Sequence, residues 1–238
     1  MSSTTFAFKQ FVIKQDKCAM KVGTDAVLLG SWVIPNGAPN ILDIGTGTGV
    51  IALMLAQKSS ADIFAIDMDE MAVAQAKINV EESSFKNKIS VSHQTFQEFV
   101  KNNSFKFDLI VTNPPYFVDS LKNPDSNRSN ARHNHVLPFS DLIEGVKIIL
   151  GSKGKFCLIL PKKEAETFRE LAEVKGLHLS KLLRIRTRLD KEEEKRHLMQ
   201  FEFHPSEFSE STMVIEAGGP EKYSDEYKNL TKDYHIHF

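Results

Sequence analysis

Short apolar runs alternate with segments of helical character along most of the chain. Apolar runs bounded by turn residues are typical of buried strands, and stretches rich in good helix formers are typical of helices. The pattern predicts strands at residues 40–44, 61–67, 88–93, 107–113, 155–161, 177–187 and 196–204. It predicts helices at residues 50–58, 71–80, 139–150 and 162–175. No repeat or long linker interrupts the alternation, so we expect one domain over residues 1–238.

The order of these elements predicts the sheet. Strands that alternate with helices form a mostly parallel sheet with helices on both faces. The last two predicted strands are joined by the charged sequence DKEEEKR, at residues 190–196, without a helix between them. We therefore expect an antiparallel strand at the edge of the sheet. The elements alone predict an α/β nucleotide-binding architecture.

The composition, with 41% hydrophobic and 26% charged residues, is typical of a soluble globular protein. The first residues, MSSTTFAFKQF, lack the basic and apolar regions of a signal peptide, and no apolar run is long enough to cross a bilayer. Cys18 and Cys157 form no CxxC motif, so neither a zinc site nor a disulfide framework is indicated. We therefore expect a cytoplasmic protein without a metal.

The net charge is only −1, but the positive charges are unevenly distributed. Residues 122–135 and 181–197 are both rich in Lys, Arg and His. Such patches bind phosphate backbones, although a solvated surface with ordinary lysines is an equal alternative. Charge alone therefore leaves nucleic-acid binding open.

A glycine-rich loop, GTGTG at residues 45–49, directly follows the strand ILDI and precedes a predicted helix. Glycines let the backbone turn tightly and approach a ligand where a Cβ would collide. A dinucleotide would also suit such a loop, but the spacing is GxGxG rather than GxGxxG. Asp43 is badly placed beside a pyrophosphate and well suited to the cationic amino-acid end of S-adenosylmethionine. The loop therefore favours S-adenosylmethionine as the cofactor.

The second predicted strand ends in an acidic residue, Asp67. Its carboxylate is expected to accept hydrogen bonds from the two hydroxyls of a ribose, although the same acid would serve NAD. The alternative is an exposed acid at a helix start, a role that Asp69 fits better as an N-cap. Met68, between the two acids, is expected to pack on the face of an adenine.

The fourth predicted strand is followed by Asn113, Pro114, Pro115 and Tyr116. Two successive prolines cannot continue a strand ladder and hold the backbone in a rigid turn. Ligands of open α/β sheets bind beyond the carboxyl ends of the strands, where this turn is expected. The alternative is a plain loop after a strand. A rigid turn with an amide and an aromatic ring at that edge suits a planar amine.

Methylation of an adenine N6 explains why the turn carries an amide. The N6 lone pair is delocalised into the ring, so the nitrogen is a poor nucleophile. The side-chain oxygen of Asn113 and the carbonyl of Pro114 would each accept one N6 hydrogen and favour a pyramidal, more nucleophilic nitrogen. Tyr116 would stack on the base with Phe117 beside it, and the base must be unpaired or flipped. Positioning and electrostatics would supply the rate, without a metal or a covalent nucleophile.

The sequence ILDIGTGTGVIAL, Asp67 and NPPY together resemble the class I methyltransferases that modify planar nitrogens. Residues 8–32, FKQFVIKQDKCAMKVGTDAVLLGSW, are similar more narrowly to the bacterial tRNA1(Val) adenine N6-methyltransferases. Residues 131–143, ARHNHVLPFSDLI, and 223–235, YSDEYKNLTKDYH, resemble the same family. The resemblance covers essentially the whole chain. It implies methylation of the adenine on the 3′ side of the anticodon in valine tRNA.

The resemblance further implies a Rossmann-like α/β fold with a seven-stranded, mostly parallel sheet, an antiparallel edge strand and helices on both faces. S-adenosylmethionine is the implied methyl donor, and no metal or obligatory protein partner is implied. The implied cofactor-binding residues are Asp43, Gly45, Thr46, Gly47, Gly49, Asp67, Met68, Lys21 and Thr24. The implied catalytic residues are Asn113, Pro114, Pro115 and Tyr116, and the implied substrate-binding residues are Phe117, Asp25, Arg132 and His133. A structural salt bridge is an equal alternative for Arg132.

These assignments divide the single domain into an N-terminal cap over residues 1–39, a catalytic core over residues 40–204 and a C-terminal extension over residues 205–238. One departure from the family concerns the end of the third strand. Many relatives carry an acid there near the cofactor adenine, whereas this chain has HQTF at residues 93–96. We expect backbone groups or Gln94 to contact the adenine instead.

Several other functions share parts of this pattern. Enzymes that methylate a glutamine amide of release factors share NPPY, but the segment before the glycine loop is too short for their helical domain. DNA adenine methyltransferases need a target-recognition domain, and no insertion here is long enough. A guanine N2 methyltransferase of ribosomal RNA is an alternative that Tyr116 fits less well. A non-catalytic binding module does not need Asn113, and an NAD-dependent oxidoreductase has no use for the NPPY turn.

Overall fold

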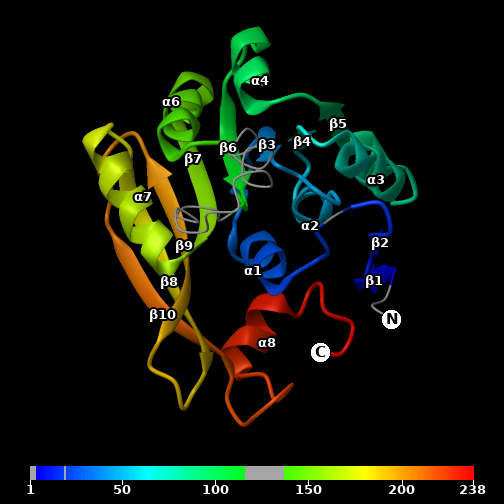
Figure 1. Ribbon diagram of the computed structural model, residues 1–238, viewed down its shortest axis with the longest axis vertical. Helices are drawn as coiled ribbons and strands as arrows, with labels where there is room; N and C mark the ends of the chain where they lie inside the picture. The colour runs from blue at the N-terminus through cyan, green and yellow to red at the C-terminus, as the bar shows by residue number, and fades with distance from the viewer. Residues whose placement is uncertain (1–3, 19, 116–136) are drawn as a thin grey trace, which may run out of the picture.

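A computed structural model of the protein describes residues 4–18, 20–115 and 137–238 (Figure 1). Its strands are β1 (Thr5–Ala7), β2 (Val12–Lys14), β3 (Asn40–Ile44), β4 (Asp62–Asp67), β5 (Ile89–His93), β6 (Phe107–Thr112), β7 (Leu150–Pro161), β8 (His178–Arg188), β9 (Glu194–Glu202) and β10 (Ser209–Glu216). Its helices are α1 (Thr24–Trp32), α2 (Val50–Gln57), α3 (Glu70–Glu81), α4 (Phe96–Asn102), α6 (Phe139–Ile149), α7 (Lys162–Val174) and α8 (Asp225–Thr231), with a short 3₁₀ turn at Lys86–Lys88. All the strands and helices expected from the sequence are confirmed. None of the helices in the described ranges is long and apolar enough to cross a membrane.

The central sheet has the strand order β10-β8-β9-β7-β6-β3-β4-β5. Neighbouring strands are parallel, except that β9 is antiparallel to both β7 and β8. The expected mostly parallel sheet is therefore confirmed. Two details of the expectation are wrong for the described part of the chain. The sheet has eight strands rather than seven, and its antiparallel strand is internal rather than at the edge.

The edge strand at this end of the sheet is β10, which pairs in parallel with β8. Among the residues of β10, only Met213 and Ile215 are buried. Two inward apolar side chains make a weak hydrophobic pattern, so the sequence alone does not predict this strand. The sheet consequently continues beyond residue 204, into the segment expected as a C-terminal extension.

Helices cover both faces of the sheet (Figure 1), with α1, α2, α3 and α8 on one face and α4, α6 and α7 on the other. The first core lies between the sheet and α1, α2, α3 and α8, and the second core lies between the sheet and α4, α6 and α7. Side chains along a strand point to these cores in turn: in β3, Ile41 packs into the first core, whereas Leu42 and Ile44 pack into the second. Strands buried on both faces have no polar side, which explains why they are continuous apolar runs in the sequence.

Among the described residues, three helices, α1, α4 and α8, are not among the elements predicted from the sequence. Most of α1 is buried, since it packs against α2 and α8 on the face of the sheet. A helix that is buried all round lacks the amphipathic period that identifies a helix in a sequence. The start of α4 could have been recognised in the sequence, because Thr95 and Glu98 have the spacing of a capping box and form one in the structure.

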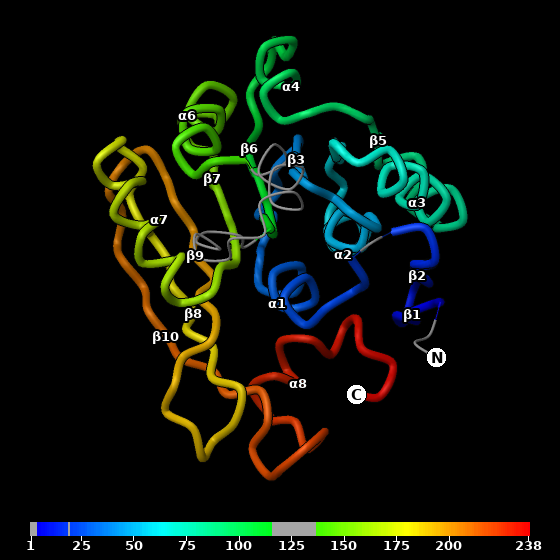
Figure 2. The backbone as a smooth tube through the Cα atoms, viewed as in Figure 1, coloured from blue at the N-terminus to red at the C-terminus, as the bar shows by residue number. Residues whose placement is uncertain are grey.

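The segment around β1, near the N-terminus, lies beside the C-terminal segment that follows α8 (Figure 2). Lys9 donates a backbone hydrogen bond to the carbonyl of Tyr234, and Phe8 forms a β-bridge with His235. The Tyr234 hydroxyl donates to the carbonyl of Met54 in α2, over a distance of 2.8 Å. The C-terminal segment is therefore joined both to the N-terminal segment and to α2, the helix that follows the glycine loop.

Candidate active site

The glycine loop lies at the carboxyl end of β3 and leads into α2. Gly45, Gly47 and Gly49 all have positive φ angles, of 70°, 56° and 82°. A Cβ on Gly45 or Gly47 would meet no atom within 4 Å, whereas one on Gly49 would lie 3.4 Å from the Cβ of Ala76 in α3. The backbone conformation therefore favours glycine at all three positions, whereas a Cβ at the third would only make ordinary contact with α3.

Asp43 is completely buried at the end of β3, on the same strand that leads into the glycine loop. One of its carboxylate oxygens accepts a hydrogen bond from the Thr46 hydroxyl at 2.6 Å. The other oxygen, Oδ1, accepts no well-formed hydrogen bond from the described residues, although the backbone N–H of Ala52 is close enough to the carboxyl to lower its pKa. Burial, together with the negative charge of Asp67, raises the pKa of Asp43 to about 7. A buried acceptor without a well-formed hydrogen bond is costly, so a cationic ligand group at this position would relieve an existing penalty.

Asp67 ends β4 beside the same loop. Its two oxygens accept backbone hydrogen bonds from Gly47, at 2.8 Å, and from Asp69, at 2.9 Å. A carboxylate has about four acceptor sites, so two remain for ribose hydroxyls. Asp69 accepts hydrogen bonds from Met71 and Ala72, which confirms it as the N-cap of α3. Met68, between the two acids, is 39% exposed, as an adenine-stacking residue must be.

The third expected part of the site, Asn113-Pro114-Pro115, directly follows β6. Thr112, the last residue of β6, is opposite Ile44 in β3 and donates from its hydroxyl to the Ile44 carbonyl at 2.9 Å. Two loops, one starting at Gly45 and one at Asn113, therefore leave adjacent strands at the same edge of the sheet. Tyr116, Phe117, Arg132 and His133, which were also expected in the site, lie outside the described residues.

The N-terminal cap also reaches this edge. Thr24 starts α1, and the carboxylate of Asp25 accepts from the guanidinium of Arg196 in β9 at 2.8 Å. Arg196 is opposite Pro161, the last residue of β7, so the ion pair lies at the carboxyl end of that strand. Lys21 is exposed just before α1. The structure thus brings Thr24 and Asp25 to the expected edge, and it gives Asp25 a structural partner that the sequence did not reveal.

Several cations of the basic segment 181–197 are paired with acidic side chains. Arg184 contacts Glu210 at 2.5 Å and Glu194 at 3.1 Å, and His197 also contacts Glu194 at 2.8 Å. Further ion pairs of the segment are Arg188–Asp190, Lys195–Glu193, Arg196–Asp25 and, with a lysine of α7, Lys162–Glu194. These contacts join β8, β9, β10 and α1 to one another. For these cations, the pairing favours a structural role over the binding of RNA phosphates.

We expect Arg184→Ala to lower the free energy of unfolding by about 1 kcal/mol, because it leaves Glu194 and Glu210 without this partner. The affinity for RNA and its dependence on salt should remain those of the wild type. Urea titration and filter binding at several salt concentrations measure the two effects. Arg169→Ala, an exposed arginine of α7, is the matched control. If the RNA affinity of Arg184→Ala depended clearly less on salt than that of the wild type, the segment would have to be counted as part of the RNA-binding surface.

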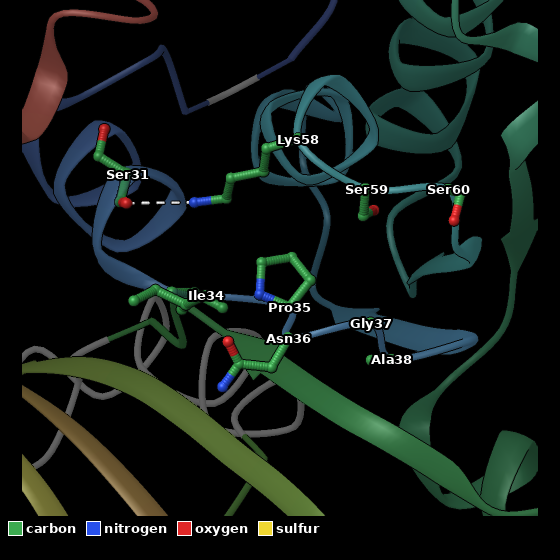
Figure 3. Close-up of a pocket in the computed structure, with 10 residues that line it drawn as sticks. Ser31, Ile34, Pro35, Asn36, Gly37, Ala38, Lys58, Ser59 and Ser60 are labelled. Atoms are coloured by element: carbon green, nitrogen blue, oxygen red, sulfur yellow. Dashed lines mark hydrogen bonds between the residues drawn. The ribbon is translucent and has the colours of Figure 1, made fainter.

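A pocket of about 530 Å³ lies away from this site, at the loop that leads into the amino end of β3 (Figure 3). Lys58, on its wall, donates to the carbonyls of Gly30 at 2.6 Å and Ser31 at 3.1 Å, at the last turn of α1. Burial lowers the pKa of Lys58 to about 8. A lysine that satisfies the last carbonyls of a helix has a structural role. The pocket contains none of the expected site residues.

Comparison with known proteins agrees with this geometry. A family model described as the methyltransferase small domain matches residues 19–165. The chain is 44% identical over 237 residues to the tRNA1(Val) (adenine(37)-N6)-methyltransferase of Bacteroides fragilis, with 99% of each chain covered. It is 40% identical over 241 residues to the protein of the same name from Trichodesmium erythraeum, with 100% of each chain covered.

Among solved structures, a predicted O-methyltransferase, Atu636 from Agrobacterium tumefaciens, matches with a TM-score of 0.69. The match covers 88% of this chain and 96% of that chain at 17% identity, so it supports the fold alone. The curated relatives, by contrast, match the sequence from end to end. The chain belongs to the methyltransferase small-domain family and, within it, to the tRNA1(Val) (adenine(37)-N6)-methyltransferases.

Proposed function

We propose that the protein transfers the methyl group of S-adenosylmethionine to the exocyclic N6 of an adenine in tRNA, the adenine on the 3′ side of the anticodon of valine tRNA. The observation that carries this proposal is the adjacency of two loops. The turn that begins at Asn113 leaves β6 next to the glycine loop, which leaves β3. A base bound at the turn would therefore be close to a cofactor bound at the glycine loop. The names of the curated relatives support adenine and valine tRNA as the substrate.

The residues of the glycine loop fit the proposed cofactor. Asp43 offers a buried oxygen that accepts no well-formed hydrogen bond from the described residues, which suits the cationic amino-acid end of S-adenosylmethionine. Asp67 retains acceptor capacity for two ribose hydroxyls, and Met68 is exposed beside it for the adenine. The hydroxyl of Thr46 is already bonded to Asp43, so we assign this side chain to holding the carboxylate rather than to direct contact with the cofactor.

When bound, S-adenosylmethionine supplies an electrophilic methyl group. Asn113 and Pro114 act on the other reactant, because the amide oxygen of Asn113 and the carbonyl of Pro114 accept the two N6 hydrogens. These two acceptors favour a pyramidal nitrogen, whose lone pair is then no longer shared with the ring. As the methyl group bonds to N6, its bond to the sulfonium sulfur would break and leave S-adenosylhomocysteine. The two acceptors would stabilise the positive charge that develops on N6, and one N6 hydrogen would then pass as a proton to water. Pro115 limits the freedom of the turn and so keeps the acceptors in place.

Transfer to a glutamine amide of a release factor or to a guanine N2 of ribosomal RNA would use the same planar-nitrogen geometry. The names of the curated relatives favour adenine over both. A cytoplasmic location and the division into cap, core and extension stay predictions.

The test is to incubate the purified protein with radiolabelled S-adenosylmethionine and unmodified valine tRNA, and then to identify the labelled nucleoside by mass spectrometry. We expect N6-methyladenosine at the position 3′ to the anticodon. A valine tRNA in which this adenine is replaced by guanine is the matched control and should remain unlabelled. Label in guanosine, or label only in protein or ribosomal RNA, would contradict the proposal.

A further inference from the structure

Two buried amides on α3 hold the N-terminal segment of the chain. Asn79 is 1% exposed and Gln75 is fully buried, and they lie one turn apart on the same face of the helix. Amides in the interior of a helix need hydrogen-bond partners from outside that helix, since the helical backbone is already paired. In α3 these partners come from the backbone of residues 14–17 and from the glycine loop.

Asn79 makes three hydrogen bonds. Its Oδ1 accepts from the backbone N–H of Lys14 at 2.9 Å, and its Nδ2 donates to the Lys14 carbonyl at 2.9 Å. The same Nδ2 donates to the carbonyl of Thr48, in the glycine loop, at 2.8 Å. The side chain therefore pairs with Lys14 as a neighbouring strand would and joins that residue to the glycine loop. These partners also fix the orientation of the amide, because Oδ1 must face the N–H donor and Nδ2 must face the two carbonyl acceptors.

Gln75 holds the next part of the segment. Its Oε1 accepts from the backbone N–H of Lys17 at 2.8 Å, whereas its Nε2 is buried without a partner among the described residues. Among the described contacts, Gln75 makes one hydrogen bond to the backbone of Lys17, whereas Asn79 makes two to the backbone of Lys14. Amide exchange should be slower at Lys14 than at Lys17 for this reason.

The segment held by these amides is also tied to the start of α1. Gln15, which is 6% exposed, accepts from the backbone N–H of Val22 at 2.9 Å, and this contact joins the residue after β2 to the segment just before α1. Cys18, next to the segment, lies near Asp67 and Asp69. Partial burial and these two negative charges raise the pKa of its thiol. Hydrogen bonds support the same placement, because Asn79 joins Lys14 to Thr48 in the glycine loop, and Gly47 of that loop donates to Asp67, the carboxylate that we assign to the ribose.

We propose that Asn79 and Gln75 are positioning residues for cofactor binding. They dock residues 14–17 onto α3 and the glycine loop, so that this segment and Cys18 are held at the Asp67 end of the cofactor site. This inference rests on the proposed function, because it assumes that Asp67 binds the ribose. Neither amide needs to touch the cofactor.

The test compares Asn79→Ala and Gln75→Met, which keeps the side-chain volume, with Val146→Ala. Val146 is fully buried in the second core, on the opposite face of the sheet. Calorimetry measures the Kd for S-adenosylhomocysteine, hydrogen exchange measures protection of the Lys14 and Lys17 amides, and thermal unfolding measures the Tm. We expect both amide variants to weaken binding by about tenfold and to lose protection at the residue each one holds. Val146→Ala should lower the Tm without either effect.

In steady-state assays the amide variants should raise KM for the cofactor more than they lower kcat, because the docked segment positions the cofactor and does not contact the reacting atoms. Wild-type Kd values in both variants, or an equal rise in Val146→Ala, would overturn the inference. If Asn79→Ala does not fold, Gln75→Met decides alone. A wild-type protein that binds no S-adenosylhomocysteine would instead contradict the proposed function, and the exchange of the Lys14 and Lys17 amides would still show whether the side chains dock the segment.

Discussion

Asn113→Ala is expected to lower kcat by about 10²–10³-fold while the fold and the Kd for S-adenosylmethionine stay those of the wild type. Asn113 follows β6 at the edge of the sheet and is half-buried, so removal of its amide leaves no cavity in either core. What is lost is one of the two acceptors for the N6 hydrogens. Single-turnover methylation of valine tRNA, with cofactor affinity measured by calorimetry, separates the two effects.

Asn113→Asp is the matched control, because a carboxylate of the same size still accepts a hydrogen from N6. It should retain at least about tenfold more activity than Asn113→Ala, since a hydrogen bond of this kind contributes 1 kcal/mol or more. An Asn113→Ala enzyme with undiminished turnover would remove the proposed mechanism, although the fold and the cofactor site would stand.

Asp43→Asn should change stability and binding in opposite directions. The wild-type carboxylate is fully buried, and one of its oxygens accepts no well-formed hydrogen bond within the part of the chain that the structure describes. Loss of its charge should therefore raise the Tm of the cofactor-free protein by about 5 °C. The same change removes the charge that would face the cationic amino-acid end of the cofactor. The Kd for S-adenosylmethionine should therefore rise about 10- to 100-fold. Thermal unfolding and calorimetry on one sample measure both.

The pKa of Asp43 gives these effects a pH dependence. Burial raises this pKa from 3.8 to about 7, so between these values the folded protein holds a proton that the unfolded chain has released. The stability of the cofactor-free wild type should consequently fall as the pH rises through this interval, and the Tm advantage of Asp43→Asn should be largest above about pH 7. Cofactor affinity should rise through about pH 7 in the wild type and stay level in Asp43→Asn. A variant that is less stable at every pH, or that binds the cofactor normally, would show that Asp43 has a structural role only.

Much of the fold was determined by the sequence itself. Strands such as β3 and β6 are buried on both faces, so the need for continuous apolar residues is visible without any knowledge of their neighbours. The glycine loop and the N-cap at Asp69 are equally local, because positive φ angles and a free helix N-terminus each demand particular residue types. The order of strands and helices then placed both loops at the carboxyl edge of one sheet.

The tertiary structure alone decided which polar groups find partners. Asp25 and Arg196 are far apart in the sequence, and nothing in either segment shows that they pair. The same holds for Asn79, whose partners belong to β2 and the glycine loop, and for Oδ1 of Asp43, which lacks a well-formed hydrogen bond among residues 4–18, 20–115 and 137–238. Hydrogen bonds and ion pairs depend on distances of a few ångströms between segments that the chain brings together only when it folds. Apolar periodicity and backbone conformation are local properties and can be inferred from the sequence, whereas these contacts can be identified only in the folded protein.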